Sequence, residues 1–68
     1  MNDILICLGK RIADLRNKRG LTQEKLAELL DISPRQLQRI ESGQTETSIK
    51  TLKKLIKILD ISDEDIVN

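Results

Sequence analysis

Two segments with the apolar spacing of amphipathic helices are separated by only three residues in the middle of the chain. In the stretch LTQEKLAELLDISPRQLQRIESG, that break consists of Asp31, Ile32 and Ser33. Leucine and isoleucine recur at three- and four-residue steps on both sides of it, which is the spacing of one helix face. A connection this short makes two helices meet at a steep angle, as in a helix-turn-helix. We therefore predict a helix-turn-helix over about residues 22–42.

The segment after the break carries a set of helix-start signals. Ser33 is predicted as the N-cap and Pro34 as the first helical residue, and Gln36 has the spacing that closes a capping box with Ser33. Thr22 suits the N-cap of the preceding helix, and Gly43 is predicted to end the following one.

Helical periodicity continues through the rest of the chain. One helix is predicted before Gly20 and one from Ile49 to Leu59, and the sequence ISDEDIV, with Ser62 and Asp65 as a capping box, predicts a short fifth helix. The residues of the fourth helix that are predicted to face inward are Ile49, Leu52, Leu55, Ile56 and Leu59. We expect an all-α fold, a compact five-helix bundle that forms a single domain over residues 1–68.

Composition excludes several classes of function. The 68 residues allow one small domain, and the absence of Phe, Tyr and Trp removes the stacking platforms that bind single-stranded nucleic acid. With a single cysteine and no histidine, we expect no disulfide, no metal site, no cofactor and no catalytic centre. The cluster SDEDI is read as a helix start with favourable charges rather than as a metal site. The apolar run ILICL is far too short to span a membrane, so a cytoplasmic protein with no membrane partner is expected.

The predicted third helix has two chemically different faces when residues 33–42 are placed at steps of about 100°. Leu37, Ile40 and Glu41 share one face. The opposite face and its edges lack a carboxylate and carry Arg35, Gln36, Gln38, Arg39 and Ser42. Arginine can form two hydrogen bonds to guanine, and glutamine can pair with adenine, in the major groove of DNA. Such a face can also be merely solvated, but its place in a helix-turn-helix favours contact with duplex DNA.

Taken together, these motifs resemble the phage-repressor and Cro type of helix-turn-helix domain, the XRE-like family. The resemblance covers about residues 8–67 and is carried by LTQEKLAELLDIS, IESG and ILDISDEDI. It implies a five-helix repressor-like bundle that binds operator DNA, usually as a dimer. It also implies that Pro34, Arg35, Gln36 and Arg39 face bases, and we predict Arg35, Gln36 and Arg39 as the base-reading residues.

The resemblance further implies contacts to the DNA backbone from two places. The residues concerned are Thr22 and Gln23 at the start of the second helix, and Ser42, Gln44 and Thr45 after the third helix, the latter partly through backbone amides. The chain departs from the family pattern at Pro34 and at Asp31, which replaces the common glycine. It also departs near Gln44, where relatives often have lysine or arginine and this loop instead adds Glu46. Asp31 implies either a different turn geometry or a polar residue in the left-handed conformation.

Glu41 presents an electrostatic problem because it falls on the apolar face, where a lone carboxylate is costly to bury. Relatives pair the matching arginine and glutamate between the first and third helices. We therefore predict a partly buried ion pair between Arg16 and Glu41 that supports the third helix without touching DNA.

The function predicted from these features is sequence-specific binding of a double-stranded DNA operator in transcription regulation. The setting stays open between a phage repressor, a restriction–modification controller and an antitoxin. The alternative is a protein-interaction module that binds a partner such as a toxin. One reading helix covers half of a typical operator, so a homodimer is expected, formed through Ile4–Cys7 or through the C-terminal helix.

Overall fold

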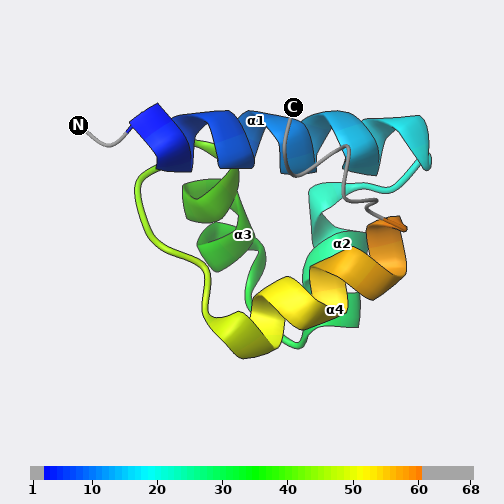
Figure 1. Ribbon diagram of the computed structural model, residues 1–68. Helices are drawn as coiled ribbons and strands as arrows, with labels where there is room; N and C mark the ends of the chain where they lie inside the picture. Colours follow the sequence, from blue (N-terminus) through cyan, green and yellow to red (C-terminus); the bar gives the residue numbers. More distant parts are fainter. Residues whose placement is uncertain (1–2, 61–68) are drawn as a thin grey trace.

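The computed structural model describes residues 3–60, and these form four α-helices with no strand among them. The helices are α1 (Asp3–Lys18), α2 (Gln23–Leu30), α3 (Pro34–Glu41) and α4 (Ile49–Leu59), as drawn in Figure 1. The prediction of an all-helical fold is confirmed for this part of the chain. The predicted fifth helix, with Ser62 and Asp65, lies outside the described residues, so four of the five expected helices are present.

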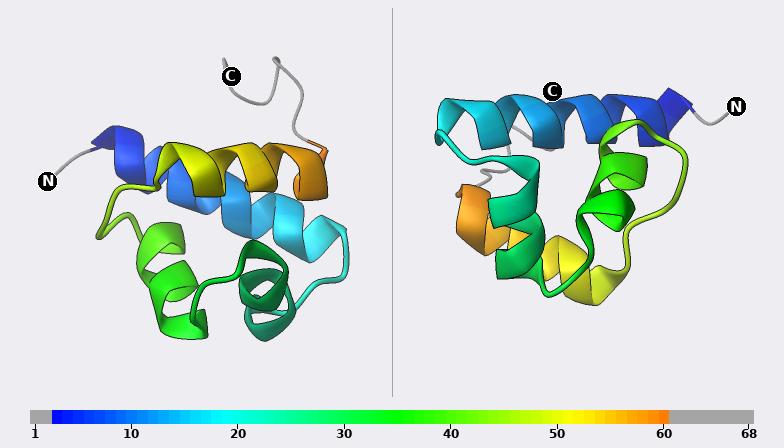
Figure 2. Two further views of the ribbon diagram at one scale, coloured as in Figure 1. Left: turned by 90° about the horizontal axis from the view of Figure 1, so that it is seen from below. Right: turned by 180° about the vertical axis from the view of Figure 1, so that it is seen from behind.

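The helices form two layers. Figure 2 shows α2 and α3 together on one side of the molecule, with α1 and α4 on the other. The α2–α3 pair meets at a steep angle, which is the helix-turn-helix that the short break predicts. None of the four helices in residues 3–60 is long and apolar enough to span a bilayer.

The turn between α2 and α3 is made by Asp31 in the left-handed conformation, with φ 59° and ψ 42°. Aspartate tolerates this region better than most residues because its short polar side chain crowds the backbone little. The amide of Ile32 donates to the carbonyl oxygen of Ala27 at 3.0 Å, which closes the end of α2. Of the two alternatives left open by the sequence, the structure shows the left-handed one.

The start of α3 has both hydrogen bonds of a capping box. The backbone amide of Gln36 donates to Oγ of Ser33 at 3.1 Å, and the backbone amide of Ser33 donates to Oε1 of Gln36 at 2.8 Å. Pro34, the first residue of α3, has no N–H group, so one fewer amide of the first turn needs a partner. The prediction for this helix start is confirmed.

The core is purely aliphatic and lies between the two layers. Its buried residues are Ile12, Leu15, Leu26, Ala27, Leu30, Leu37, Ile40, Leu55 and Leu59. The prediction that Ile49 faces inward is wrong, because 73% of its surface is exposed. It is the first residue of α4, one turn before Leu52, where the cover of the neighbouring helices begins.

α1 crosses the end of α3 in direct backbone contact. A Cβ atom at Gly9 would lie 2.4 Å from the carbonyl oxygen of Glu41 and 2.5 Å from that of Ile40. One turn earlier in α1, Ile6 packs against Gly43, which has φ +77°. These contacts fix the position of α3 relative to α1, and the sequence analysis did not identify Gly9 as a crossing point.

Candidate nucleic-acid interface

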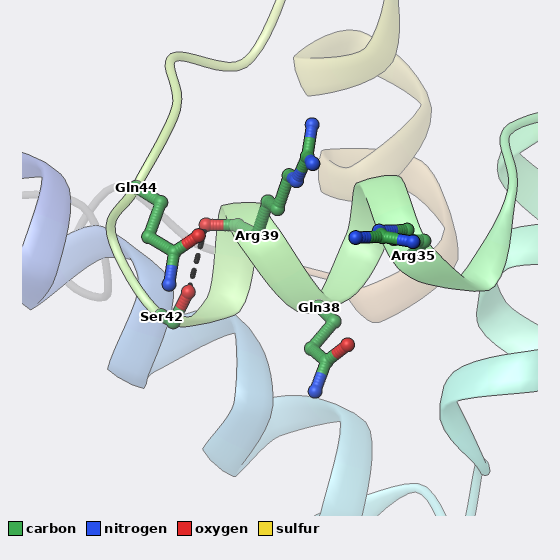
Figure 3. A pocket seen from close by; sticks show the side chains of 5 residues that line it. All are labelled: Arg35, Gln38, Arg39, Ser42 and Gln44. Atoms are coloured by element: carbon green, nitrogen blue, oxygen red, sulfur yellow. Dashed lines mark hydrogen bonds between the residues drawn. The ribbon is translucent and has the colours of Figure 1, made fainter.

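The outward side of α3 and the loop after it form an open depression of about 260 Å³. Figure 3 shows the side chains that line it, which are Arg35, Gln38, Arg39, Ser42 and Gln44. Gln38 and Arg39 lie three and four positions after Arg35, and Ser42 lies three positions after Arg39, so these four residues share one face of the helix. All five are exposed to solvent. We call this depression the α3 face.

The two arginines of the α3 face keep their side-chain donors available within the part of the chain that the structure describes. Among residues 3–60, neither Arg35 nor Arg39 has a side-chain hydrogen bond or an ion pair. No carboxylate lines the depression, so nothing there neutralises the two charges. The face can therefore offer ten N–H donors, roughly five for each guanidinium group, to a ligand.

Gln36 lies beside this face and not in it. Its side chain is exposed, but Oε1 already accepts the hydrogen bond that caps α3. The NH₂ group and the second lone pair of Oε1 are left for another partner. A paired contact to adenine would have to share Oε1 with the cap.

The segment after α3 is more fully hydrogen-bonded than expected. Oγ of Ser42 donates to the carbonyl oxygen of Arg39 at 3.1 Å. The backbone amides of Ser42, Gly43 and Gln44 all donate to carbonyl groups of α3. The backbone amides of these three residues are thus already engaged, and the exposed side chains of Gln44 and Thr45 remain as donors in this loop.

The start of α2 combines a helix cap with a link to α3. Oγ1 of Thr22 accepts from the backbone amide of Lys25 at 3.0 Å, so its hydroxyl proton is still available. Nε2 of Gln23 donates to Oε1 of Glu41 at 2.9 Å, a bond that the sequence analysis missed. Because Nε2 carries two protons, Gln23 retains one N–H for another acceptor.

Arg16 and Glu41 form the ion pair expected from the sequence. Nε of Arg16 lies 2.8 Å from Oε2 of Glu41, and Nη2 lies 3.3 Å from Oε1. Nη1 of Arg16 also donates to the carbonyl oxygen of Leu21 at 2.8 Å. The side chains are only 12% and 6% exposed. Together with Gln23, this pair connects α1, the start of α2 and the end of α3.

Comparison with known proteins gives a consistent result. The family model described as Helix-turn-helix matches residues 12–66. The HTH-type transcriptional regulator PuuR of Escherichia coli (strain K12) is 34% identical over 62 residues, which cover 91% of this chain and 34% of PuuR. This chain therefore spans about a third of the length of that relative.

Two restriction–modification controller proteins have similar structures. C.AhdI from Aeromonas hydrophila aligns with a TM-score of 0.85 and 32% identity, over 96% of this chain and 98% of that chain. C.Esp1396I, solved as a tetramer in complex with its natural 35 base-pair operator, aligns over 100% of both chains with a TM-score of 0.80 and 25% identity.

Proposed function

The chain belongs to the helix-turn-helix family, and on this basis we propose that it is a sequence-specific, double-stranded DNA-binding transcriptional regulator. In this proposal α3 inserts into the major groove. The observation that carries it is the exposed, carboxylate-free α3 face on the second helix of the helix-turn-helix. A major groove about 12 Å wide admits one α-helix with its side chains.

The proposed base-reading residues are Arg35, Gln36 and Arg39. The two arginines have free guanidinium groups on the α3 face, which suit guanine. Gln36 can donate to a base through its NH₂ group, while Oε1 already accepts the bond that caps the helix. Oxygen or N7 acceptors on a base edge suit the NH₂ group.

The proposed contacts to phosphate come from the two flanks of α3. At the start of α2, the hydroxyl of Thr22, the remaining N–H of Gln23 and the positive end of the helix dipole favour a phosphate. After α3, Gln44 and Thr45 supply exposed side chains. Ser42 contributes only if its hydroxyl turns away from the carbonyl oxygen of Arg39.

We propose that the chain acts on DNA as a homodimer. One α3 covers about half of a typical operator, and dimers place two reading helices about 34–36 Å apart. In support, the similar protein C.Esp1396I binds its operator as a tetramer. The apolar Ile4, which is 77% exposed, and the exposed Cys7 leave α1 as one candidate surface. The other candidate, the C-terminal segment, lies outside the described residues.

The proposal is tested by selecting bound sites from a random duplex library, followed by titration of labelled duplexes. We expect enrichment of a motif with two-fold symmetry, and affinity that falls steeply with salt. Arg35→Ala and Arg39→Ala should each weaken binding to the selected site by about 1–3 kcal/mol and relax specificity at one base position.

Lys57→Ala, which removes one exposed positive charge from α4, is the matched control and should leave base preference unchanged. If no duplex is preferred over random DNA, the proposed function is wrong. If both arginine variants keep the affinity and preference of the original chain, DNA is read by another surface.

The second candidate function is binding of a protein partner, as in an antitoxin. It is favoured by the exposed Ile4 beside Cys7 at the start of α1, since single exposed apolar residues can anchor a partner. Co-expression with the neighbouring gene product, followed by purification of the complex, tests it. A stable complex that is lost in Ile4→Ser and that has no preference among duplexes would replace the DNA-binding proposal.

A further inference from the structure

We infer that each operator half-site contains two guanines, one or two base-pair steps apart, and that Arg35 and Arg39 read them. This inference rests on the proposed function and adds the identity and the spacing of the bases. Three properties of the molecule support it: the hydrogen bonds of the arginines, the chemistry of the α3 face and the rise of the helix per residue.

Four arginines of the structure, Arg16, Arg19, Arg35 and Arg39, fall into two groups according to where their hydrogen bonds go. Arg16 bonds to Glu41 and to the carbonyl oxygen of Leu21, and Arg19 donates to the last carbonyl oxygen of α4, that of Leu59. Within residues 3–60, Arg35 and Arg39 have no such bonds. They also lie four residues apart on one helix face, where two like charges slightly destabilise the helix. Neither side chain makes a contact that supports the fold in residues 3–60, so both guanidinium groups are available to a ligand.

The chemistry of the α3 face selects the base. A guanidinium group carries donors only, in a planar fork. In the major groove, guanine alone presents two acceptors on one edge, O6 and N7, whereas adenine presents one acceptor beside a donor. With no carboxylate in the lining to compete for the forks, each arginine is matched to one guanine.

The helix geometry limits the spacing. Arg35 and Arg39 are separated by about 6 Å along the axis of α3, at 1.5 Å per residue. Base pairs follow one another at about 3.4 Å, so a helix parallel to the DNA axis would span just under two steps. A helix that follows the groove advances roughly one base pair per three or four residues, as zinc-finger helices do. Both limits place the guanines one or two steps apart.

A contact to phosphates is the competing role for these side chains. It would weaken binding to all duplexes alike and would show no dependence on the N7 atom of any base. Base analogues therefore separate the two roles. Replacing guanine by 7-deazaguanine removes the N7 acceptor and leaves base pairing intact.

The experiment titrates the 68-residue chain and its variants with the selected duplex and with duplexes carrying 7-deazaguanine at one guanine at a time. We expect the unmodified chain to lose about 5-fold or more at each of the two guanines, since a full arginine–guanine pair is worth roughly 5- to 160-fold. Arg35→Ala should become insensitive to one replacement and Arg39→Ala to the other. Lys57→Ala should stay sensitive to both.

Three outcomes decide against the inference. A selected motif without guanines at this spacing would overturn it and leave sequence-specific DNA binding intact. Equal sensitivity of the original chain and both arginine variants to 7-deazaguanine would do the same, because it would assign the guanines to other residues. Absence of any enriched motif would remove the proposed function, and the inference with it. Both arginine variants should unfold at the same temperature as the original chain. Equal unfolding temperatures show that any change in DNA binding is not caused by a loss of folding.

Discussion

Polar side chains on the inward side of α3 have hydrogen-bond partners within the protein, whereas the two arginines on its outward side lack them within residues 3–60. On the inward side, Glu41 is 6% exposed and accepts hydrogen bonds from Arg16 and Gln23. On the outward side, Arg35 and Arg39 are exposed and have no partner within residues 3–60. Two sides of one eight-residue helix thus contain a saturated and an unsaturated polar cluster.

The difference separates residues that position the helix from residues that can contact a ligand. A buried carboxylate must be paired, because leaving it unpaired costs several kcal/mol. An exposed guanidinium group is hydrated and can stay unpaired at little cost. Substitutions on the inward side should therefore change stability, and substitutions on the outward side should change binding. The predictions below test this separation.

The largest expected effect comes from Gly9→Ala, at the crossing of α1 and α3. In an ordinary helix, alanine would be the more stable residue by about 1 kcal/mol. Here the new Cβ would lie 2.4 Å from a backbone oxygen of α3, so the helices must separate. We expect a loss of about 3 kcal/mol in the free energy of unfolding, measured by urea denaturation. Lys10→Ala, the exposed neighbour in the same helix, should be nearly neutral, and a stabilising Gly9→Ala would disprove this contact.

Glu41→Gln should have the next largest effect. It keeps the shape of the side chain but leaves the guanidinium group of Arg16, which is 12% exposed, without a counter-charge. We expect a loss of about 2 kcal/mol in the free energy of unfolding, because the side-chain oxygen that remains can still accept a hydrogen bond from Arg16. The matched change on the outward side, Arg35→Ala, should cost less than about 0.5 kcal/mol by the same measurement. Similar losses of stability in the two variants would show that the inward and outward sides do not differ in their contribution to folding.

Gln23→Ala tests a residue that bonds to the inward cluster and that we also assign to a DNA contact. It removes the bond to Glu41 and the remaining N–H that we assign to a phosphate. We expect a loss of about 1 kcal/mol in the free energy of unfolding, and a similar loss in binding to every duplex alike. Gln38→Ala, on the α3 face, should leave stability unchanged. A change in base preference caused by Gln23→Ala would contradict the phosphate assignment.

The smallest expected effect is that of Glu46→Gln in the loop after α3. Glu46 is exposed, two residues from Gln44 in the lining of the α3 face, and should repel the phosphates there. The substitution should strengthen DNA binding by less than about 1 kcal/mol, and the gain should vanish in high salt. Asp14→Asn, on α1, is the control for a general charge effect. Equal gains from both variants would remove the loop from the interface.

Local signals in the sequence predicted most of the fold. Capping residues such as Ser33 and Thr22 act on atoms within three positions of themselves, so their hydrogen bonds can be read from spacing alone. The Arg16–Glu41 pair was within reach because a carboxylate on an apolar face demands a partner. The exposed side of α3 followed from the helical wheel.

The errors and omissions concern contacts between elements. Ile49 has the periodicity of a core residue, but periodicity cannot show that no other helix reaches the first turn of α4. In the sequence, Gly9 is only a residue of low helix propensity. Its role becomes visible when the backbone of α3 is placed against α1. The bond from Gln23 to Glu41 depends on how α2 sits against α3, a relation that no spacing in the sequence encodes.

The capping role of Gln36 has a consequence for how new operators could be acquired. Any substitution at this position other than glutamate gives up one bond of the capping box, so a change of preference there is tied to a loss of helix stability, about 1 kcal/mol for a typical cap. The exposed side chains of Arg35, Gln38 and Arg39 make no contact that stabilises the fold in residues 3–60, so they can be replaced without loss of stability. Engineering of altered target sites should randomise these three codons and hold Gln36 constant, and natural divergence among such regulators should follow the same asymmetry.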